Sequence, residues 1–145
     1  MSYKGLGKLI FIDGKINSKE YQRILTEKLL STIEDAFYDE HCIFQHDRVP
    51  VYSSKSTQLW LNNQGLHVLP WPSNSPDLNP IENVWRNIIF MIRSADRLQG
   101  TKQELKHFIM ASCETYQVET CRKLINSIPD RCKNVLKMNS YPTKY

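Results

Sequence analysis

Apolar positions along the chain recur at two spacings, which together predict an alternation of strands and helices. Short apolar runs at residues 8–14, 41–45 and 66–69 predict three strands. Between them, apolar residues three or four positions apart predict helices over residues 18–33 and from Ser53 or Ser54 to Asn62. Strand, helix, strand, helix, strand is the order of a parallel α/β fold.

The pattern changes after the third strand. Residues 72–80 contain three prolines and two asparagines, which predict an irregular loop. Pro80 suits the first turn of a helix that begins at Ile81. The predicted apolar stripe of this helix comprises Ile81, Val84, Trp85, Ile88, Ile89 and Ile92.

The rest of the chain is predicted to be helical. Thr101 is the expected N-cap of a helix that runs to about Tyr116, with Glu104 at the capping-box position. A further helix is expected over about residues 118–127, and Pro129 opens a short additional turn.

Composition is ordinary for one globular domain, and the charge is unevenly distributed. The 145 residues are 41% hydrophobic and 23% charged, with a net charge of +4. Residues 1–85 carry 8 Lys/Arg against 10 Asp/Glu, whereas residues 86–145 carry 11 against 5. The basic part suits a polyanionic partner. A set of solvated helix faces explains the same charges equally well.

The cysteines and the hydropathy argue against two other classes of protein. Cys42, Cys113, Cys121 and Cys132 form no Cys-x-x-Cys pair, so a zinc site is not expected. No apolar run approaches the roughly 20 residues of a membrane span.

Two carboxylates occupy positions where a metal site could form. Asp47 follows an apolar strand, and ligands bind at the carboxyl ends of strands in open α/β sheets. Glu82 falls in the first turn of its helix, and 34 residues separate it from Asp47. Two acids with Mg2+ could carry phosphoryl-transfer chemistry. Taken singly, such an Asp is more often a turn or cap residue, and such a Glu more often compensates the helix dipole.

The sequence around these acids resembles the catalytic domain of mariner-superfamily transposases. Residues 44–47 (Phe-Gln-His-Asp) are similar to the family strand that delivers the second catalytic Asp. Residues 75–85 (Ser-Pro-Asp-Leu-Asn-Pro-Ile-Glu-Asn-Val-Trp) resemble the block that delivers the catalytic Glu, and residues 5–14 resemble another family strand. The resemblance implies an α/β, RNase H-like, three-layer fold of the DDE class, with Asp47 and Glu82 as catalytic ligands of Mg2+ or Mn2+.

The resemblance also implies a domain layout and partners. Residues 1–145 would form one partial DDE catalytic domain, with a core over about residues 3–95 and a basic helical part over about residues 96–145. The expected partner is DNA at transposon ends, in the nucleus, with no membrane. The candidate nucleic-acid contacts are Arg48, Lys55, Arg86, Arg93 and Arg97.

The sequence departs from the family pattern in two places. The family has a first catalytic Asp on a strand upstream of the segment that residues 5–14 resemble, and no residue of this sequence matches it. Asp13 lies at the end of what resembles the third strand and does not replace it. After Asp47 the family commonly has Asn and, later, His, where this chain has Arg48 and Tyr52. Arg48 could pair with Asp47 or contact phosphate.

Three functional hypotheses follow. The first is a transposase-derived endonuclease domain, incomplete at its N-terminus and inactive by itself because one of three acids is missing. The second is a non-catalytic module that binds DNA or a full-length transposase through its basic helices. The third is an inert relic. Without its first strand, the sheet would expose an unpaired edge, which favours self-association.

Overall fold

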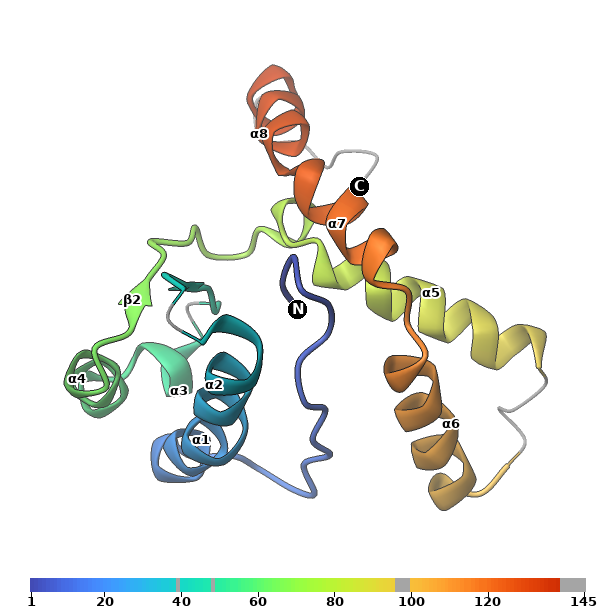
Figure 1. Ribbon diagram of the computed structural model, residues 1–145, viewed down its shortest axis with the longest axis horizontal. Helices are drawn as coiled ribbons and strands as arrows, with labels where there is room; N and C mark the ends of the chain where they lie inside the picture. The colour runs from blue at the N-terminus through green and yellow to red at the C-terminus, as the bar shows by residue number, and fades with distance from the viewer. Residues whose placement is uncertain (39, 48, 96–99, 139–145) are drawn as a thin grey trace. The chain divides into compact units, whose positions relative to one another are not determined.

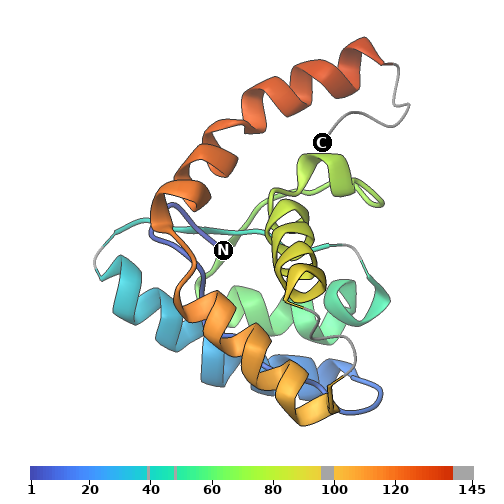
Figure 2. The same ribbon diagram turned by 90° about the vertical axis from the view of Figure 1, so that its right-hand side faces the viewer.

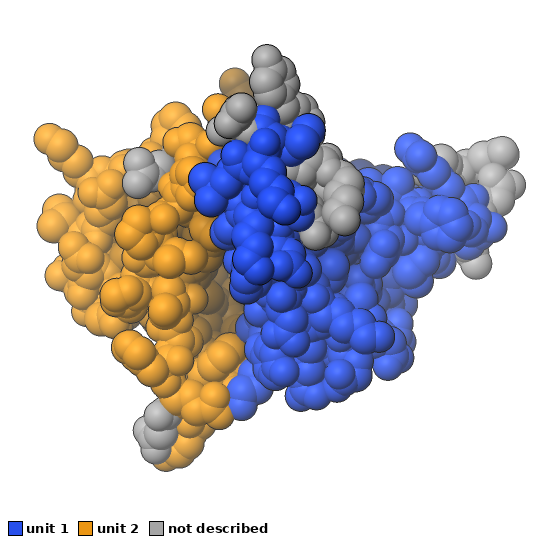
Figure 3. Space-filling model, turned by 90° about the horizontal axis from the view of Figure 1, so that it is seen from above, with its two compact units in different colours: residues 1–9, 75–145 blue, residues 10–74 orange. Residues whose placement is uncertain are grey.

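The computed structural model describes residues 1–38, 40–47, 49–95 and 100–138. It divides the chain into two compact units, which are coloured separately in Figure 3. Unit 1 comprises residues 1–9 and 75–145, and unit 2 comprises residues 10–74. The predicted boundary between a core and a basic helical part, near residue 95, stays a prediction. Each unit is described below by itself.

The first helices of unit 2 form one long segment, drawn in blue to teal in Figure 1. It consists of α1 (Ser18–Ile24), a π-helical turn (Leu25–Leu30) and α2 (Ser31–Phe37). The side chain of Asn17 caps α1 by accepting a hydrogen bond from the Glu20 amide at 2.9 Å. An Asn N-cap satisfies an amide that has no partner within the helix. The helix predicted over residues 18–33 is therefore confirmed, and it continues for about one more turn.

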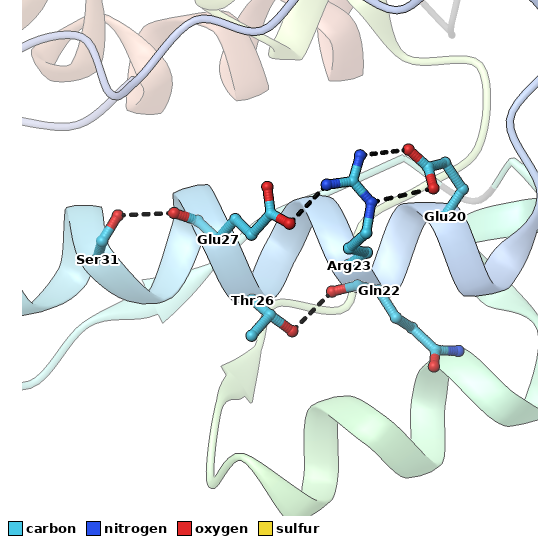
Figure 4. Close-up of polar contacts among 6 residues, drawn as sticks. All are labelled: Glu20, Gln22, Arg23, Thr26, Glu27 and Ser31. Atoms are coloured by element: carbon cyan, nitrogen blue, oxygen red, sulfur yellow. Dashed lines mark hydrogen bonds and ion pairs between the residues drawn. The ribbon is translucent and has the colours of Figure 1, made fainter.

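Hydrogen bonds and ion pairs join residues one helical turn apart on the exposed face of this segment (Figure 4). The Arg23 guanidinium lies 2.6 Å from a Glu20 oxygen and 2.5 Å from a Glu27 oxygen. Hydrogen bonds and charge from these two acids raise the pKa of Arg23, and the bond from Arg23 lowers the pKa of Glu20. The positive charge of Arg23 is thus matched locally by two carboxylates.

The sheet of unit 2 is small. Strands β1 (Ile43–Phe44) and β2 (His67–Val68) pair in parallel, with Ile43 opposite His67 and Phe44 opposite Val68. Two helices, α3 (Pro50–Ser53) and α4 (Lys55–Asn63), connect them in a βαβ unit. The strand–helix–strand order predicted for residues 41–69 is confirmed.

The strand predicted at residues 8–14 is wrong. These residues adopt no strand pairing, and the sheet contains only β1 and β2 among the residues that the structure describes. An apolar run becomes a strand only when a neighbouring strand accepts its backbone hydrogen bonds. Apolar character by itself therefore did not determine this element.

The core of unit 2 lies between α1, the π-helical turn and α4. Tyr21, Leu25 and Leu61 are buried there. Thr57 is also buried, and its hydroxyl donates to the Val51 carbonyl at 3.0 Å, which satisfies both groups. Although Leu59 is apolar, it does not lie on the core face of α4, because its side chain is 62% exposed. Residues four apart share a helix face, so Thr57 and Leu61 face the core instead.

Unit 1 is helical. A 3₁₀ turn, η2 (Pro76–Leu78), precedes α5 (Ile81–Ser94). Helices α6 (Lys102–Glu114), α7 (Val118–Asn126) and α8 (Ile128–Lys137) follow one another along the orange-to-red ribbon in Figure 2. Within the described ranges, no helix combines the length and apolar character needed to cross a membrane.

Local signals located most of these helices. The capping box of α6 is confirmed: Thr101 Oγ1 accepts from the Glu104 amide at 3.2 Å, and a Glu104 oxygen accepts from the Thr101 amide at 2.7 Å. The short turn predicted at Pro129 is an underestimate, because α8 continues to Lys137. Proline fits the first turn of a helix, where its missing amide hydrogen costs nothing, so it starts α8 and does not limit its length.

The core of unit 1 lies along one side of α5. Val84, Ile88 and Ile92 are buried against partly buried side chains of α6, including Leu105, Phe108 and Ile109. Trp85 and Ile89 were predicted on the same stripe, but they are 37% and 47% exposed. Each lies about 100° around the helix from its buried neighbour. The prediction of a core position for Trp85 is therefore wrong.

Candidate metal and nucleic-acid site

Asp47 lies where the sequence predicted it, just beyond the carboxyl end of β1. Its side chain is exposed. It makes no hydrogen bond or ion pair with any residue that the structure describes. Arg48 was predicted either to pair with Asp47 or to contact phosphate. It lies outside the described residues. The Asp47 carboxylate is thus available to a cation or to a polar ligand.

A pocket of about 680 Å³ opens beside Asp47 within unit 2. Its lining mixes polar and apolar side chains, among them His46, Asp47, Gln58, Asn62 and Trp71. Trp71 is 9% exposed, and its indole N–H has no hydrogen-bond partner in the described part of the chain. Asp47 therefore lines a preformed cavity, to which α4 and the segment after β2 also contribute lining residues.

The residue before Asp47 belongs to an aromatic cluster that sequence reasoning missed. His46 Nδ1 lies 3.1 Å from the Tyr21 hydroxyl oxygen. The Tyr52 ring stacks on Tyr21, with centroids 4.3 Å apart, and lies 6.0 Å from the His46 ring. Tyr52, which stands where the family commonly has His, is thus a packing residue of unit 2. The available signal was the apolar spacing that placed Tyr21 on the buried face of its helix.

Burial and charge act in opposite directions on His46. Burial lowers its pKa, and the Asp47 carboxylate opposes that shift. Burial, together with the neighbouring Tyr52, raises the pKa of Tyr21 well above its usual range. The neutral forms of both rings are therefore favoured at neutral pH.

Glu82 is the second residue of α5. Its amide donates to the Asn79 carbonyl at 3.2 Å, while the side-chain oxygen of Asn79 accepts from the Ile81 amide at 3.4 Å. Pro80 precedes the helix with φ −67°, an angle already suited to helix entry. The Glu82 side chain is exposed and makes no hydrogen bond or ion pair with any described residue. A carboxylate in this first turn is favoured by the helix dipole.

The turn before Glu82 is held by a residue that was not predicted. Arg131 of α8 is 1% exposed, and its guanidinium donates to the Asp77 carbonyl at 3.1 Å and to Asn83 Oδ1 at 2.8 Å. A signal existed in the sequence, because Arg131 lies three residues after Ile128 and four before Val135. A cation on an apolar helical stripe indicates a buried polar partner.

The candidate nucleic-acid contacts are only partly described. Arg86 and Arg93 are exposed on α5, seven residues apart, and so lie on the same side of that helix. Lys55 is exposed at the start of α4 in unit 2. Arg48 and Arg97 lie outside the described residues. The structure thus groups Arg86 with Arg93, and it describes Lys55 in the other unit.

The donor chemistry suits a hard divalent cation. Asp47 and Glu82 are exposed carboxylates, the ligand type that Mg2+ and Mn2+ prefer. Mg2+ is commonly held by one or two carboxylates, with water and substrate phosphate as the other ligands. Across the described ranges, no cluster of three or more His, Cys, Asp or Glu could hold a metal ion. Asp47 belongs to unit 2 and Glu82 to unit 1.

Comparison with known proteins gives a consistent result. A family profile described as "DDE superfamily endonuclease" matches residues 1–106. The Tc3 transposase of Caenorhabditis elegans is 29% identical over 135 residues, which are 93% of this chain and 41% of the relative. The Tcb1 transposase of Caenorhabditis briggsae is 31% identical over 140 residues, which are 97% and 50%. The chain spans half or less of the length of these relatives.

Solved structures agree with the sequence match. The catalytic domain of Mos1 transposase, solved with Raltegravir and Mn, superposes with a TM-score of 0.78 at 19% identity, over 99% of this chain and 74% of that chain. A pre-cleavage Mos1 transpososome superposes with a TM-score of 0.81 at 18% identity, over 98% of this chain and 43% of that chain. At these identities the likeness concerns the fold.

Proposed function

Because this chain belongs to the DDE superfamily of endonucleases, as a homologue of the Tc1/mariner transposases, we propose that Asp47 and Glu82 are two of its catalytic metal ligands. The site would hold Mg2+ or Mn2+ and act on DNA at transposon ends, in the nucleus. One observation carries this proposal. Both carboxylates are exposed, and neither makes a hydrogen bond or ion pair with a residue that the structure describes. Asp47 follows a strand and Glu82 lies at the start of a helix, both within the region that the family profile matches.

The surroundings of each acid support a role as a ligand. An acid needed only for a turn or a helix cap would use its carboxylate to accept a backbone amide, as Asn17 and Thr101 do with their side chains. Neither Asp47 nor Glu82 accepts such a bond from a described residue. Glu82 lies on a helix, where an unpaired carboxylate needs little reorganisation to bind a cation.

Each residue of the site would have a separate role. When bound, divalent ions would activate the attacking water or hydroxyl and stabilise the leaving oxygen of the scissile phosphate. Asp47 and Glu82 would hold the ions, and the amino end of α5 would favour negative charge near Glu82. His46, neutral and in contact with the Tyr21 hydroxyl, would hold the end of β1 in place without adding a competing positive charge.

We further propose that residues 1–145 cleave no DNA by themselves. The family site uses three acids, and the residue expected to precede the segment at residues 5–14 has no match in this sequence. With two carboxylates, the site would bind metal weakly and leave the nucleophile without a fixed position. Incubation with supercoiled plasmid and Mg2+ is expected to yield no nicked circles.

Metal binding tests the assignment independently of cleavage. Paramagnetic Mn2+ broadens the NMR signals of nearby amides, so titrating 15N-labelled protein should first broaden the amides around residues 47 and 82. Glu82→Gln and Asp47→Asn should each raise the Mn2+ concentration needed by at least about tenfold, the lower limit of what even outer-shell changes cost a metal site. Added Mg2+ should reverse the broadening.

The matched control for Glu82→Gln is Glu114→Gln. Glu114 is an exposed acid in the same unit, at the end of α6, and its removal should leave the titration unchanged. If Glu82→Gln relieves the broadening around residue 47 as well, the two acids share an ion. Broadening that is indifferent to both site variants would contradict the proposal.

The uneven charge supports a second candidate function. Residues 86–145 carry six more basic than acidic side chains, and Arg86 and Arg93 are exposed on one side of α5. The chain could therefore act as a non-catalytic module that binds DNA or a full-length transposase. Under this hypothesis Glu82→Gln leaves DNA binding intact, and metal binding has no influence on it.

A further inference from the structure

Arg131 is the most deeply buried charged residue among those described. Its side chain is 1% exposed, although it lies on α8, far along the chain from the acidic turn. Its Nε donates to Ser127 Oγ at 2.8 Å, and its two terminal nitrogens donate to the Asp77 carbonyl and to Asn83 Oδ1. The planar fork of the guanidinium is thus divided among three acceptors from three segments.

A buried guanidinium remains charged, so it requires hydrogen-bond acceptors in the folded protein. Arginine does not lose its proton in proteins, and an unpaired charge removed from water carries a large free-energy penalty. Each acceptor that moves away leaves part of that charge uncompensated. The turn containing Asp77 and the first turn of α5 are therefore constrained to one arrangement around Arg131.

The contacts lie on both sides of Glu82. Asp77, in η2, is five residues before it, and Asn83 is the residue immediately after it. The hydroxyl of Ser127, the acceptor nearest the stem of the arginine, is itself fixed by donating to the Leu124 carbonyl at 2.6 Å. Ser127, at the end of α7, therefore helps to orient the Arg131 guanidinium toward the turn that contains Asp77.

We propose that Arg131 is a positioning residue for the metal site, which fixes the backbone on both flanks of Glu82. This inference rests on the proposed role of Glu82 as a metal ligand. Arg131 lies beyond residue 106, where the family match ends. The C-terminal helices would thus contribute to the site through geometry, without touching metal or DNA.

Amide hydrogen exchange, measured by NMR on the 145-residue protein, tests the positional role without any metal. In Arg131→Gln, the amides of Asn79, Glu82 and Asn83 should exchange about tenfold faster. Loss of a hydrogen bond from a charged group makes local opening more favourable by about this factor. Arg131→Lys keeps the charge but not the fork, so an intermediate increase is expected. Amides of α6, such as that of Leu105, should be unaffected.

The functional part is read from the Mn2+ titration of the same variants. Arg131→Gln should raise the Mn2+ concentration needed to broaden the Glu82 amide by about tenfold, as loss of an outer-shell partner does. Lys133→Gln is the matched control, because it removes one exposed positive charge from the same helix. It should change neither readout by more than about twofold, the size expected of screened surface charge.

The outcomes separate this inference from the proposed function. Unchanged exchange at Asn79, Glu82 and Asn83, or equal acceleration throughout unit 1, overturns the role of Arg131. Accelerated exchange with no effect of Mn2+ on the unsubstituted protein supports the contacts of Arg131 around Glu82 and overturns Glu82 as a metal ligand. If Arg131→Gln fails to fold, Asn83→Ala removes one acceptor only and should still accelerate exchange at Glu82; normal exchange there overturns the inference.

Discussion

At the scale of single residues, burial decides the chemistry around Asp47. The His46 ring contacts the Tyr21 hydroxyl, and Tyr52 stacks on both rings. Removal from water disfavours the charged imidazolium, whereas the neighbouring carboxylate favours it. Burial is the larger effect, so the His46 pKa lies below its ordinary value of 6.5. The acid and the imidazole are therefore electrostatically coupled.

The titration of His46 should report that coupling. Its pKa, followed by NMR of the ring protons, should lie below 6.5 and fall further in Asp47→Asn, because the carboxylate that favours the charged form is gone. In the unsubstituted protein, the His46 pKa is lower in the folded chain than in the unfolded chain. The unfolded chain therefore binds more protons below about pH 6.5, and the free energy of unfolding should decrease as the pH falls from 7 to 5. His46→Gln should reduce this decrease. An increase in the His46 pKa on removal of Asp47 would contradict the arrangement.

At the scale of elements, local signals were most successful where the chain supplies its own partners. The Asn17 cap, the Thr101–Glu104 capping box and the Pro80 helix start depend on neighbours within a few residues. The helix that carries Glu82 was therefore predictable in position and type. Which of its apolar residues face the core was only partly predictable, because Ile88 is buried and Ile89 is not.

The two sides of α5 should differ strongly in their response to truncation. Ile88, 2% exposed, fills the core of unit 1, so Ile88→Ala should reduce the free energy of unfolding by about 2–5 kcal/mol through lost burial and a cavity. Phe90 is 70% exposed on the same helix, and Phe90→Ala should change it by less than about 0.5 kcal/mol. Urea unfolding followed by α5 and α6 amide signals measures both. Similar costs for the two variants would mean that α5 is packed differently.

At the scale of the whole molecule, the predicted α/β, RNase H-like fold is confirmed. The chain superposes on the Mos1 catalytic domain over 99% of its residues. The family match covers residues 1–106, and the motifs at residues 44–47 and 75–85 lie within it. What remains a proposal at this scale is the combined use of the two acids and of the basic helices.

The proposed DNA binding by the basic helices predicts a characteristic dependence on salt concentration. Each phosphate contact contributes about 0.9 to the slope of log affinity against log salt concentration. Arg86→Gln with Arg93→Gln should therefore lower the slope for duplex DNA by about 1.8, in fluorescence anisotropy titrations from 50 to 200 mM salt. Arg23→Gln is the control, because Glu20 and Glu27 already match its charge. An equal loss in the control would indicate a nonspecific effect of net charge.

The sequence by itself determined the features that depend on near neighbours: the helix starts, the two paired strands and the motifs that carry Asp47 and Glu82. The tertiary structure alone decided which apolar run lacks a strand partner, which face of α5 is buried, and where charged groups find acceptors. Arg131 shows the reason. Its acceptors at Asp77 and Asn83 lie about 50 residues away in sequence, 54 and 48 positions. No local pattern encodes contacts of that separation, because chain folding alone brings such groups together.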